Sequence, residues 1–409
     1  MGHPASREGS GLSTSFGAMW AAITPIGRSS ATGGYRRYAL TRTDHDLREW
    51  FAGEASARDL DLTTDRMGNQ WAWWGNPDAS SGIVTGSHLD SVPDGGPFDG
   101  PLGVVSSFAA LDRLRAQGFI PARPIGIVHF GDEEGARFGV ACAGSRVITG
   151  TMTADRARGL TDADGISMAD ALRSAGHDPQ TIGHDPETLG RIGCFVELHV
   201  EQGRALIDLG QPVAIGTDIW PHGRWRLDFP GEANHAGTTR IDDRRDAMIG
   251  LASTVLVARA AATGHGCLAT IGKTRLVPGG VNAIPSAATA WLDARGADED
   301  AVRDTVAEIV ASAGAYGASV VEESWTPVTR FDHALITRLR GVLPSAPLLG
   351  TGAGHDAGIL AAAGIPAAML FVRNPTGISH SPDEFAERDD CLLGVEALAT
   401  VLADLSGRS

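Results

Sequence analysis

Two short apolar segments on either side of a helical pattern constrain the fold of this chain more than any other feature. The segments cover residues 83–87 and 124–130, and apolar residues recur at helical spacing over 102–116 between them. Strand, helix and strand in this order predict a mainly parallel sheet that helices cover on both faces. Because such sheets carry their chemistry beyond the carboxyl ends of their strands, the residues that follow each strand are the first candidates for a functional site.

The pattern changes near residue 215, which predicts a second domain inserted into the first. Strands are expected over 224–229, 266–277, 287–294 and 318–323, with helices over 244–262 and 299–313. This βαββαβ order is the ferredoxin-like split motif. We therefore predict an α/β fold made of a discontinuous catalytic domain (13–215 and 327–409), an inserted α+β domain (216–326) and a disordered leader (1–12).

The composition excludes several classes of protein. The chain has 409 residues and a formal net charge of −15, and an acidic chain is repelled by nucleic acids and anionic membrane surfaces. Its four cysteines form no Cys-x-x-Cys pair, so neither a disulfide framework nor a thiolate zinc site is indicated. The start of the chain lacks a secretion signal, and the longest apolar stretch, 361–372, is broken by Gly364 and Pro366. We expect a cytoplasmic protein with no membrane span and no nucleic-acid partner.

A histidine and an aspartate follow the first of the two apolar strands. His88 comes directly after the strand, and Asp99 comes after a loop rich in glycine and proline. Turn-forming residues between two such side chains can bring both into one pocket as metal ligands. The alternative for this pattern alone is a solvated loop at the end of a strand.

Three further segments carry groups of the same kind. Glu133 and Glu134 follow the strand that ends at residue 130, His199 lies near the end of a strand expected over 191–200, and His380 follows another expected over 366–372. Because neighbouring side chains alternate in direction, Glu134 can ligate a cation while Glu133 stays unligated near a metal-bound water. The alternatives are a solvated acidic loop for the glutamates and a satisfied core histidine for His199.

Together these segments offer three imidazoles and two carboxylates: His88, Asp99, Glu134, His199 and His380. The set suits two divalent ions, with zinc or manganese preferred, cobalt or nickel also tolerated, and Asp99 able to bridge. Two such ions roughly 3.5 to 4 Å apart can hold one hydroxide between them and polarise an amide carbonyl. Glu133 would take the proton of the water and pass it to the leaving nitrogen.

The motifs resemble those of the dinuclear N-carbamoyl-L-amino-acid hydrolases, a family that includes allantoate amidohydrolases and β-ureidopropionases. They occur in family order: Gly-Ser-His88-Leu-Asp, Gly-Gly-Pro-Phe-Asp99-Gly, Glu133-Glu134-Gly-Ala-Arg-Phe, Glu197-Leu-His199-Val-Glu-Gln202-Gly and Gly377-Ile-Ser-His380-Ser-Pro. The resemblance implies that the five ligand residues hold two ions, with Asp99 bridging and Glu133 as the general base. It also implies that Asp90 orients His88.

The resemblance extends into the inserted domain. Three segments are similar to the substrate-recognition segments of the family: Gly231-Glu-Ala-Asn-His235-Ala-Gly, Val281-Asn282-Ala-Ile-Pro and Asp293-Ala-Arg295. They imply that His235 stabilises the tetrahedral oxyanion and that Asn282 and Arg295, assisted by Gln202, bind the substrate carboxylate. A guanidinium matches a carboxylate in bidentate fashion, although a surface ion pair is the alternative for Arg295.

Members of the family are generally homodimers joined through the inserted domain, so we expect a homodimer through residues 216–326. The resemblance also implies closure of this domain over the metals, and it leaves open whether recognition residues act within one subunit or across two.

One segment departs from the family pattern. Val372-Arg373-Asn-Pro-Thr-Gly377 stands where many carbamoylases carry Pro-Cys or Pro-Ser. We hypothesise that Arg373 faces the pocket and favours a substrate with a second anionic or polar group. The alternative is an Arg373 that lies on a solvated loop.

The sequence thus predicts a metal-dependent amidohydrolase that cleaves a linear carbamoyl or ureido C–N bond. Its expected substrate is small and bears a carboxylate, as in allantoate or an N-carbamoyl-L-amino acid. Hydrolysis of N-formyl or N-acetyl amino acids, or of dipeptides, is the alternative, since the same metal pair serves all of them. A non-catalytic dimeric ligand-binding protein is a more distant alternative, which the intact Glu133 and ligand residues argue against.

Overall fold

A computed structural model describes residues 5–409, and the chain divides into two compact units. The larger contains the chain up to Thr217 together with Arg330–Leu349 and Gly354–Ser409. The smaller contains Asp218–Thr329 and Gly350–Ala353. The boundaries expected from the sequence were 216 and 326, and no sequence signal indicated that residues 350–353 group with the inserted segment.

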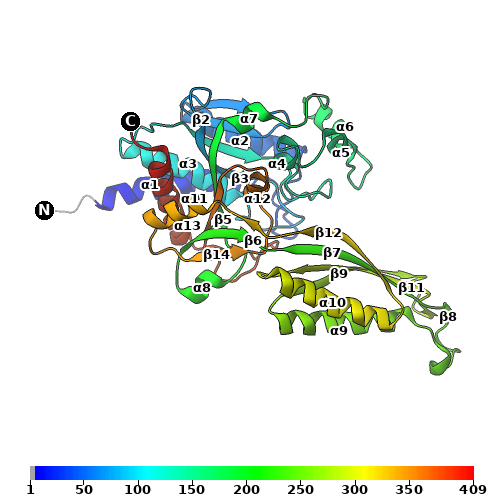
Figure 1. The fold of residues 1–409 in the computed structure, drawn as a ribbon. Helices are drawn as coiled ribbons and strands as arrows, with labels where there is room; N and C mark the ends of the chain where they lie inside the picture. Colours follow the sequence, from blue (N-terminus) through cyan, green and yellow to red (C-terminus); the bar gives the residue numbers. More distant parts are fainter. Residues whose placement is uncertain (1–4) are drawn as a thin grey trace. The chain divides into compact units, whose positions relative to one another are not determined.

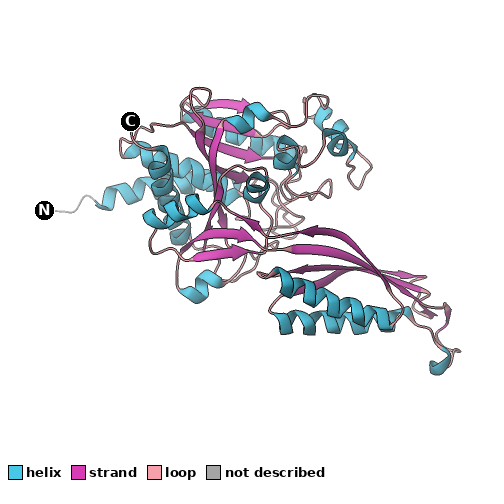
Figure 2. Ribbon diagram, in the orientation of Figure 1, coloured by secondary structure: helices cyan, strands magenta, loops and turns pink. Residues whose placement is uncertain are grey.

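A nine-stranded sheet forms the framework of the larger unit (Figure 2). Its strands, in spatial order, are β1 (Asp61–Thr64), β2 (Gln70–Trp74), β4 (Ile125–Phe130), β3 (Gly82–His88), β5 (Ile192–Val200), β15 (Ala367–Val372), β6 (Val213–Ile219) and β13 (Thr329–Arg330), with β14 (Leu348–Thr351) beside β6. The central strands β4, β3, β5 and β15 run parallel, as predicted, and β2 and β6 flank them in antiparallel orientation. Every residue of β3, β4 and β15 is buried, which explains their nearly continuous apolar sequences.

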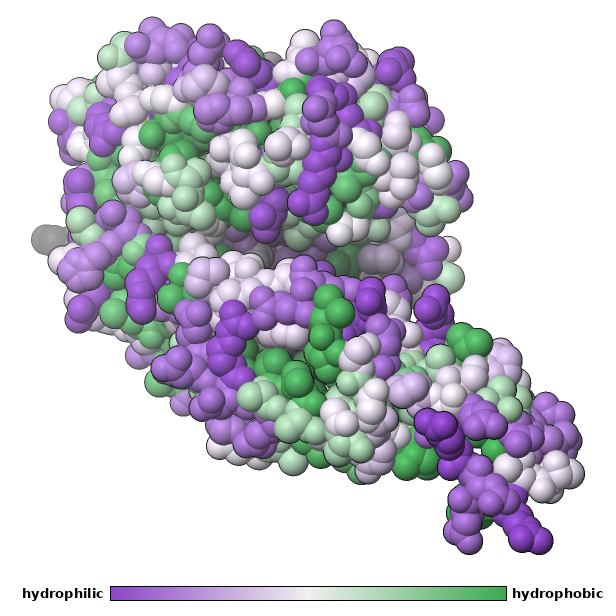
Figure 3. All heavy atoms as spheres, turned by 45° about the vertical axis from the view of Figure 1, so that its right-hand side comes forward, coloured by the Kyte–Doolittle hydropathy of each residue, from purple (hydrophilic) through white to green (hydrophobic). Residues whose placement is uncertain are grey.

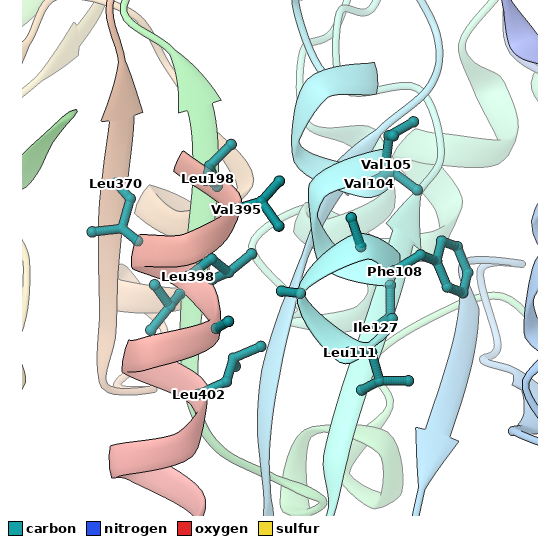
Figure 4. Close-up of a cluster of buried hydrophobic side chains, with 14 of the residues drawn as sticks. Val104, Val105, Phe108, Leu111, Ile127, Leu198, Leu370, Val395, Leu398 and Leu402 are labelled. Atoms are coloured by element: carbon teal, nitrogen blue, oxygen red, sulfur yellow. The ribbon is translucent and has the colours of Figure 1, made fainter. Parts of the chain in front are cut away.

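Helices cover both faces of this sheet (Figure 1). On one face α3 (Pro101–Ala116) and α13 (Arg388–Ser406) pack together over the central strands. Figure 4 shows Val395 and Leu398 of α13 beside Leu198 of β5, within the main hydrophobic core. Side chains alternate across a strand, and Glu197 accepts a hydrogen bond from the N–H of Ala357 in α12 (Asp356–Ala362). Helix α12 therefore covers the opposite face.

The remaining helices of the larger unit are mostly short. They are α2 (Arg42–Ala57), α4 (Ala143–Ile148), α5 (Ala154–Gly159), α6 (Met168–Ser174), α7 (Pro186–Gly190), α8 (Ala205–Leu209) and α11 (His333–Val342).

The first helix, α1 (Ala5–Ile23), corrects the expectation of a disordered leader over residues 1–12. Residues 1–4 lie outside the described part of the chain, and the helix begins at Ala5. Its buried apolar residues recur at helical spacing: Leu12, Phe16, Met19 and Ile23. This apolar face packs against α3 and α13, so helix takes the place of disorder over residues 5–12.

The smaller unit is a four-stranded sheet with two helices. Along the chain its main elements are β7 (His222–Pro230), α9 (Ala247–His265), β9 (Leu268–Val277), β11 (Ala287–Arg295), α10 (Glu299–Ala315) and β12 (Ser319–Thr326). This is the predicted βαββαβ order, and the spatial order of the strands is β12-β7-β11-β9. A two-stranded pair, β8 (Asn234–His235) and β10 (Ala283–Ile284), and a 3₁₀ turn, Ile241–Asp243, complete the unit.

Helix α9 is apolar on more than one face. By length and composition it is the one helix of the described residues that could span a membrane. The longest apolar stretch expected from the sequence was instead residues 361–372. Leu251 and Ala258 pack into the core of the unit, but Ile249 and Leu256 are 57% and 72% exposed. Hydrophobic side chains also reach the molecular surface on the face drawn in Figure 3. A helix that is apolar on its outer side is typical of one with a further partner.

Candidate metal centre

The five candidate ligand residues lie where the central parallel strands end. His88 is the last residue of β3, and His199 is the penultimate residue of β5. Glu134 follows β4, His380 follows β15 through a loop, and Asp99 lies in the loop between β3 and α3. Because adjacent parallel strands end at one edge of the sheet, residues far apart in the sequence meet in one site.

The two carboxylate oxygens of Asp99 face two different groups of side chains. Oδ1 lies 3.1 Å from His199 Nε2 and 3.6 Å from His88 Nε2. Oδ2 lies 3.3 Å from His380 Nε2, which is also 3.5 Å from Glu134 Oε2. Asp99 thus belongs both to a group with His88 and His199 and to a group with Glu134 and His380, and the ligand atoms within each group lie within 4.8 Å of one another. A carboxylate shared in this way can bridge two metal ions.

The residues present fit a divalent metal ion in each group. His88 Nε2 and Glu134 Oε1 are buried and have no hydrogen-bond partner among the described residues. A buried polar atom without a partner is costly unless a ligand completes it. Imidazole nitrogens and carboxylate oxygens are the donors that zinc and manganese accept.

Neighbouring backbone atoms set the orientation of His199. Its Nδ1 lies 2.8 Å from the carbonyl oxygen of Val200, which can accept the Nδ1 proton, and its Nε2, 3.1 Å from Asp99 Oδ1, is the nitrogen that faces the cluster. Gly100 is equally restricted, because it has a φ of 84° and a Cβ at this position would lie 2.4 Å from the His88 ring. Only glycine lets the loop pass this close to the ring.

Glu133 is buried beside His88 and is held by two other segments. Its Oε2 lies 3.7 Å from His88 Nε2, and its Oε1 accepts a hydrogen bond from the Cys142 thiol at 3.2 Å. Asp90 accepts hydrogen bonds from the backbone N–H groups of Glu133 and Glu134 at 3.2 and 3.0 Å, and its Oδ1 lies 3.5 Å from His88 Nδ1. Asp90 therefore holds the loop that carries both glutamates and lies beside the histidine that it is expected to orient.

Burial and mutual charge hold protons within the cluster when no metal is bound. Burial raises the pKa of Glu133 well above its ordinary value, against the lowering effect of His88. Burial, together with the charge of Asp99, raises the pKa of Glu134 to about 7. The hydrogen bond with Asp99 raises the pKa of His380 to about 9 despite partial burial, and the charge of Glu134 adds to this rise. Cations that bind here must displace these protons.

Further side chains that contact Asp99 lie around the cluster. Gln202, expected to assist in substrate binding, donates from Nε2 to Asp99 Oδ2 at 2.7 Å. Ser379 donates to the same oxygen at 3.1 Å, and Glu384 accepts from the backbone N–H of Asp99 at 3.0 Å. Neither Ser379 nor Glu384 was predicted from the sequence, although both lie within a few residues of His380.

A further imidazole, His355, was also missed. Its ring meets the His199 ring edge to face with centroids 4.5 Å apart, and burial lowers the pKa of His355 well below its ordinary value. Its Nε2 is buried without a partner among the described residues. The sequence signal for this residue is the Gly-His-Asp segment 354–356, in which His355 immediately precedes α12.

The three recognition residues of the smaller unit lie at opposite ends of its sheet. His235 in β8 is paired with Ala283 of β10, which makes Asn282 its neighbour, and both side chains are exposed. Figure 1 shows β8 beyond one end of β11. Arg295 is the last residue of β11, at its other end. Strand residues rise by about 3.4 Å, so the length of β11 alone separates the two positions by about 27 Å.

Arg295 already has a carboxylate partner. Its Nε and Nη2 donate to the two oxygens of Asp293 at 2.8 and 2.6 Å, and its Nη1 donates to the carbonyl oxygen of Gly352 at 2.7 Å. The ion pair fixes the guanidinium at the strand end, so binding a substrate carboxylate requires sharing or exchange of this contact.

Arg373, which we expected to face the pocket, is engaged by a carboxylate of α13. Its Nε and Nη2 donate to the two oxygens of Asp390 at 2.7 and 2.9 Å. Asp390 is buried and the Arg373 side chain is 25% exposed. The pair joins the end of β15 to α13, a contact that neither the pocket-facing nor the solvated-loop hypothesis included.

The next residue organises the loop that leads to His380. Asn374 is fully buried, and its Oδ1 accepts from the N–H groups of Thr376 and Gly377 at 3.0 and 2.9 Å. Its Nδ2 donates to the carbonyl oxygen of Ile378 at 2.8 Å. The loop thus satisfies its own backbone groups through one side chain.

Comparison with known proteins gives concordant matches. Residues 84–404 match the family described as peptidase family M20/M25/M40. The chain is 34% identical to the N-carbamoyl-L-amino acid amidohydrolase of Geobacillus stearothermophilus (93% of this chain, 96% of the relative) and 31% identical to the allantoate amidohydrolase of Escherichia coli (91% and 93%). The crystal structure of a hydantoinase/carbamoylase family amidase from Burkholderia multivorans is similar with a TM-score of 0.84 at 28% identity, covering 97% of this chain and 98% of that one.

Proposed function

Because this chain belongs to peptidase family M20/M25/M40 and is an amidohydrolase that cleaves C–N bonds of small substrates, we propose that its substrate joins a carbamoyl or ureido group to a carboxylate. The names of two relatives, an N-carbamoyl-L-amino acid amidohydrolase and an allantoate amidohydrolase, describe substrates of this class. The observation that carries the proposal is the Asp99 carboxylate, whose two oxygens face two separate ligand groups.

We propose that one ion is held by His88, Asp99 and His199 and a second by Asp99, Glu134 and His380, with zinc or manganese as the metal. Bound ions would polarise the scissile carbonyl and acidify the attacking water.

Glu133, which is not among either set of ligands, accepts the proton of the attacking water and delivers it to the leaving nitrogen. Cys142 and Asp90 fix the position of this carboxylate and of its loop. His235 donates a hydrogen bond to the oxygen that gains negative charge.

We propose that substrate recognition requires a second copy of the chain. A small substrate cannot contact two groups about 27 Å apart along one strand, so His235 and Arg295 of one chain serve different substrate molecules. A symmetric homodimer solves this, because each site then combines groups from both copies.

The smaller unit offers a surface for such a dimer. Strand β9 lies at the edge of its sheet, with Leu268, Leu276 and Val277 exposed, and α9 presents Ile249 and Leu256. An open edge strand is a template for pairing with another chain, and an exposed apolar helix face is typical of an interface. This dimer would also cover the apolar outer side of α9. We further propose that the enzyme is cytoplasmic, because its four buried cysteines are unpaired thiols.

A substrate panel on metal-reconstituted protein tests the reaction. Allantoate, N-carbamoyl, N-formyl and N-acetyl amino acids would be compared by the release of amine and of ammonia. We expect release of ammonia from the carbamoyl or ureido compounds. Their kcat/KM should be well above the kcat/KM for deacylation of the N-formyl and N-acetyl amino acids. Turnover of the N-formyl or N-acetyl compounds alone would contradict the substrate class and leave the hydrolytic centre intact.

A further inference from the structure

Glu384 is a buried carboxylate that the proposed reaction does not use. The residue is only 3% exposed, and both of its carboxylate oxygens are occupied. Oε2 accepts hydrogen bonds from the backbone N–H groups of Phe98 and Asp99 at 2.7 and 3.0 Å. Oε1 accepts from the Ser379 hydroxyl at 2.9 Å. One carboxylate thus joins the loop that carries Asp99 to the loop that carries His380.

We propose that Glu384 is a positioning residue that sets the affinity of the protein for the ion held by Asp99, Glu134 and His380. This inference rests on the proposed two-metal function. The two loops come from distant parts of the chain, and Asp99 and His380 can act on one ion only if the loops keep a fixed separation. Side chains that orient metal ligands commonly change metal affinity by about 10–100-fold when they are removed.

The neighbouring residues pack closely around the Glu384 side chain. A Cβ on Gly96 would lie 2.3 Å from Glu384 Oε2, so glycine is needed where the Asp99 loop passes the carboxylate. The rings of Phe98 and Phe385 meet edge to face at 6.3 Å, which adds an apolar contact beside the hydrogen bonds. The backbone N–H of Glu384 donates to the carbonyl oxygen of Ser381 at 3.1 Å and closes a turn immediately after His380.

The Ser379 hydroxyl connects Glu384 to the metal-binding oxygen of Asp99. Ser379 Oγ lies within hydrogen-bond distance of Glu384 Oε1 (2.9 Å) and Asp99 Oδ2 (3.1 Å). The hydroxyl has a single proton, so it donates to one carboxylate at a time. Gln202 Nε2 also donates to Asp99 Oδ2. Asp99 Oδ2 therefore still accepts a hydrogen bond when the Ser379 hydroxyl donates to Glu384. Glu384 therefore fixes the backbone of Asp99 directly and competes with the Asp99 carboxylate for the Ser379 proton.

The first experiment measures metal binding to the full-length protein. Metal-free wild type, Glu384→Ala, Glu384→Gln and Asp383→Asn would be titrated with Zn²⁺ against chelators of graded affinity. Asp383 is the exposed neighbour of Glu384, so Asp383→Asn is the matched control. In Glu384→Ala we expect one of the two ions to bind about 10–100-fold more weakly and the other to bind nearly as in the wild type.

The conservative variant Glu384→Gln separates positioning from charge. The amide oxygen of the introduced side chain can accept from both backbone N–H groups, and its amide N–H can donate to Ser379. We therefore expect Glu384→Gln to recover most of the lost affinity. Excess Zn²⁺ should restore kcat in Glu384→Ala, because the groups that act on the substrate are unchanged.

The outcomes distinguish this inference from the function on which it rests. A wild type that binds fewer than two ions overturns the proposed function and this inference together. A wild type that binds two ions, with equal affinities in Glu384→Ala, overturns the inference alone. If the melting temperature of metal-free Glu384→Ala falls below that of Asp383→Asn, Ser379→Ala replaces it as the test variant. In Ser379→Ala, a loss of affinity for one ion that is smaller than the loss expected for Glu384→Ala supports the inference. Unchanged affinity for both ions contradicts it.

Discussion

The groups for the chemical step and the groups for recognition are arranged in opposite ways. The candidate metal ligands converge within one unit, with Asp99 shared between two groups, and the ligand atoms within each group lie within 4.8 Å of one another. His88 and His199 are buried and tied to fixed partners. In the smaller unit, His235 is exposed, and the length of β11, about 27 Å, separates it from Arg295. The difference underlies our proposal that the chemical centre is complete within one chain, whereas recognition requires a second copy.

Loss of the base should have the largest effect. Glu133→Gln removes the proton acceptor but keeps the shape of the side chain, so kcat should fall by about 10²–10⁴-fold. Metal content should stay at the wild-type level, because Glu133 belongs to neither ligand group. Elemental analysis and steady-state kinetics check both points, with the exposed Glu187→Gln as control. Full activity in Glu133→Gln would refute the assigned base.

Mixing two defective variants tests whether recognition crosses between chains. His235→Ala should lower kcat by about 10²–10³-fold through the loss of an oxyanion donor, and Arg295→Ala should mainly raise KM. In a dimer of one variant with the other, one of the two sites then contains both intact groups. Random mixing after dissociation should restore about a quarter of the wild-type sites. A mixture that stays as inactive as its components would contradict the crossed arrangement.

The pH dependence of metal binding is the third expected effect. An ion at Asp99, Glu134 and His380 displaces the proton of His380, whose pKa is about 9, and that of Glu134, whose pKa is about 7. Its affinity should therefore rise by up to about tenfold per pH unit from pH 7 to 9, and more steeply below pH 7.

The metal-free protein should respond to pH in the opposite direction. The raised pKa of His380 stabilises the metal-free fold fully below pH 6.5, and this stabilisation is lost as the pH rises through about 9. Thermal unfolding with and without Zn²⁺ measures both trends. An affinity that does not change between about pH 6 and 9 would exclude displacement of these protons.

Arg373→Ala should have the smallest effect on the reaction. Removing the guanidinium leaves the buried Asp390 without its bidentate partner, so the free energy of unfolding should fall by about 1–3 kcal/mol. The ratio of kcat/KM for acidic and neutral substrates should stay constant if the arginine only anchors α13. A changed ratio would instead support the hypothesis that Arg373 contacts the substrate, and Arg373→Lys tests the need for the bidentate contact.

The central sheet and the βαββαβ unit could be predicted because their elements are long and periodic. The short helices between residues 143 and 190 could not, since each has one or two turns and its position depends on packing. Helix α1 was missed because polar residues dilute its apolar face, whose burial depends on contact with α3 and α13. Helix α9 was predicted over 244–262 and is observed over Ala247–His265.

Within the site, the residues next to strand ends could be predicted because sheet topology alone brings them together. Glu384 could not, because its partner Asp99 lies 285 positions away in the sequence and only the folded loops reveal the contact. The pairing of Arg373 with Asp390 was also missed, because Asp390 lies 17 positions away, whereas the ion pair of Arg295 with Asp293 is the kind of contact given as the alternative for Arg295. A sequence identifies a guanidinium but not which carboxylate it meets.

The loop around Asn374 makes one residue responsible for the shape of the segment that carries His380. The buried amide of Asn374 pairs with backbone groups of Thr376, Gly377 and Ile378, and the Thr376 hydroxyl adds hydrogen bonds within the same loop. Loss of this single amide would leave all of these backbone groups without their partner at once, so position 374 tolerates change far less than the exposed positions that follow it.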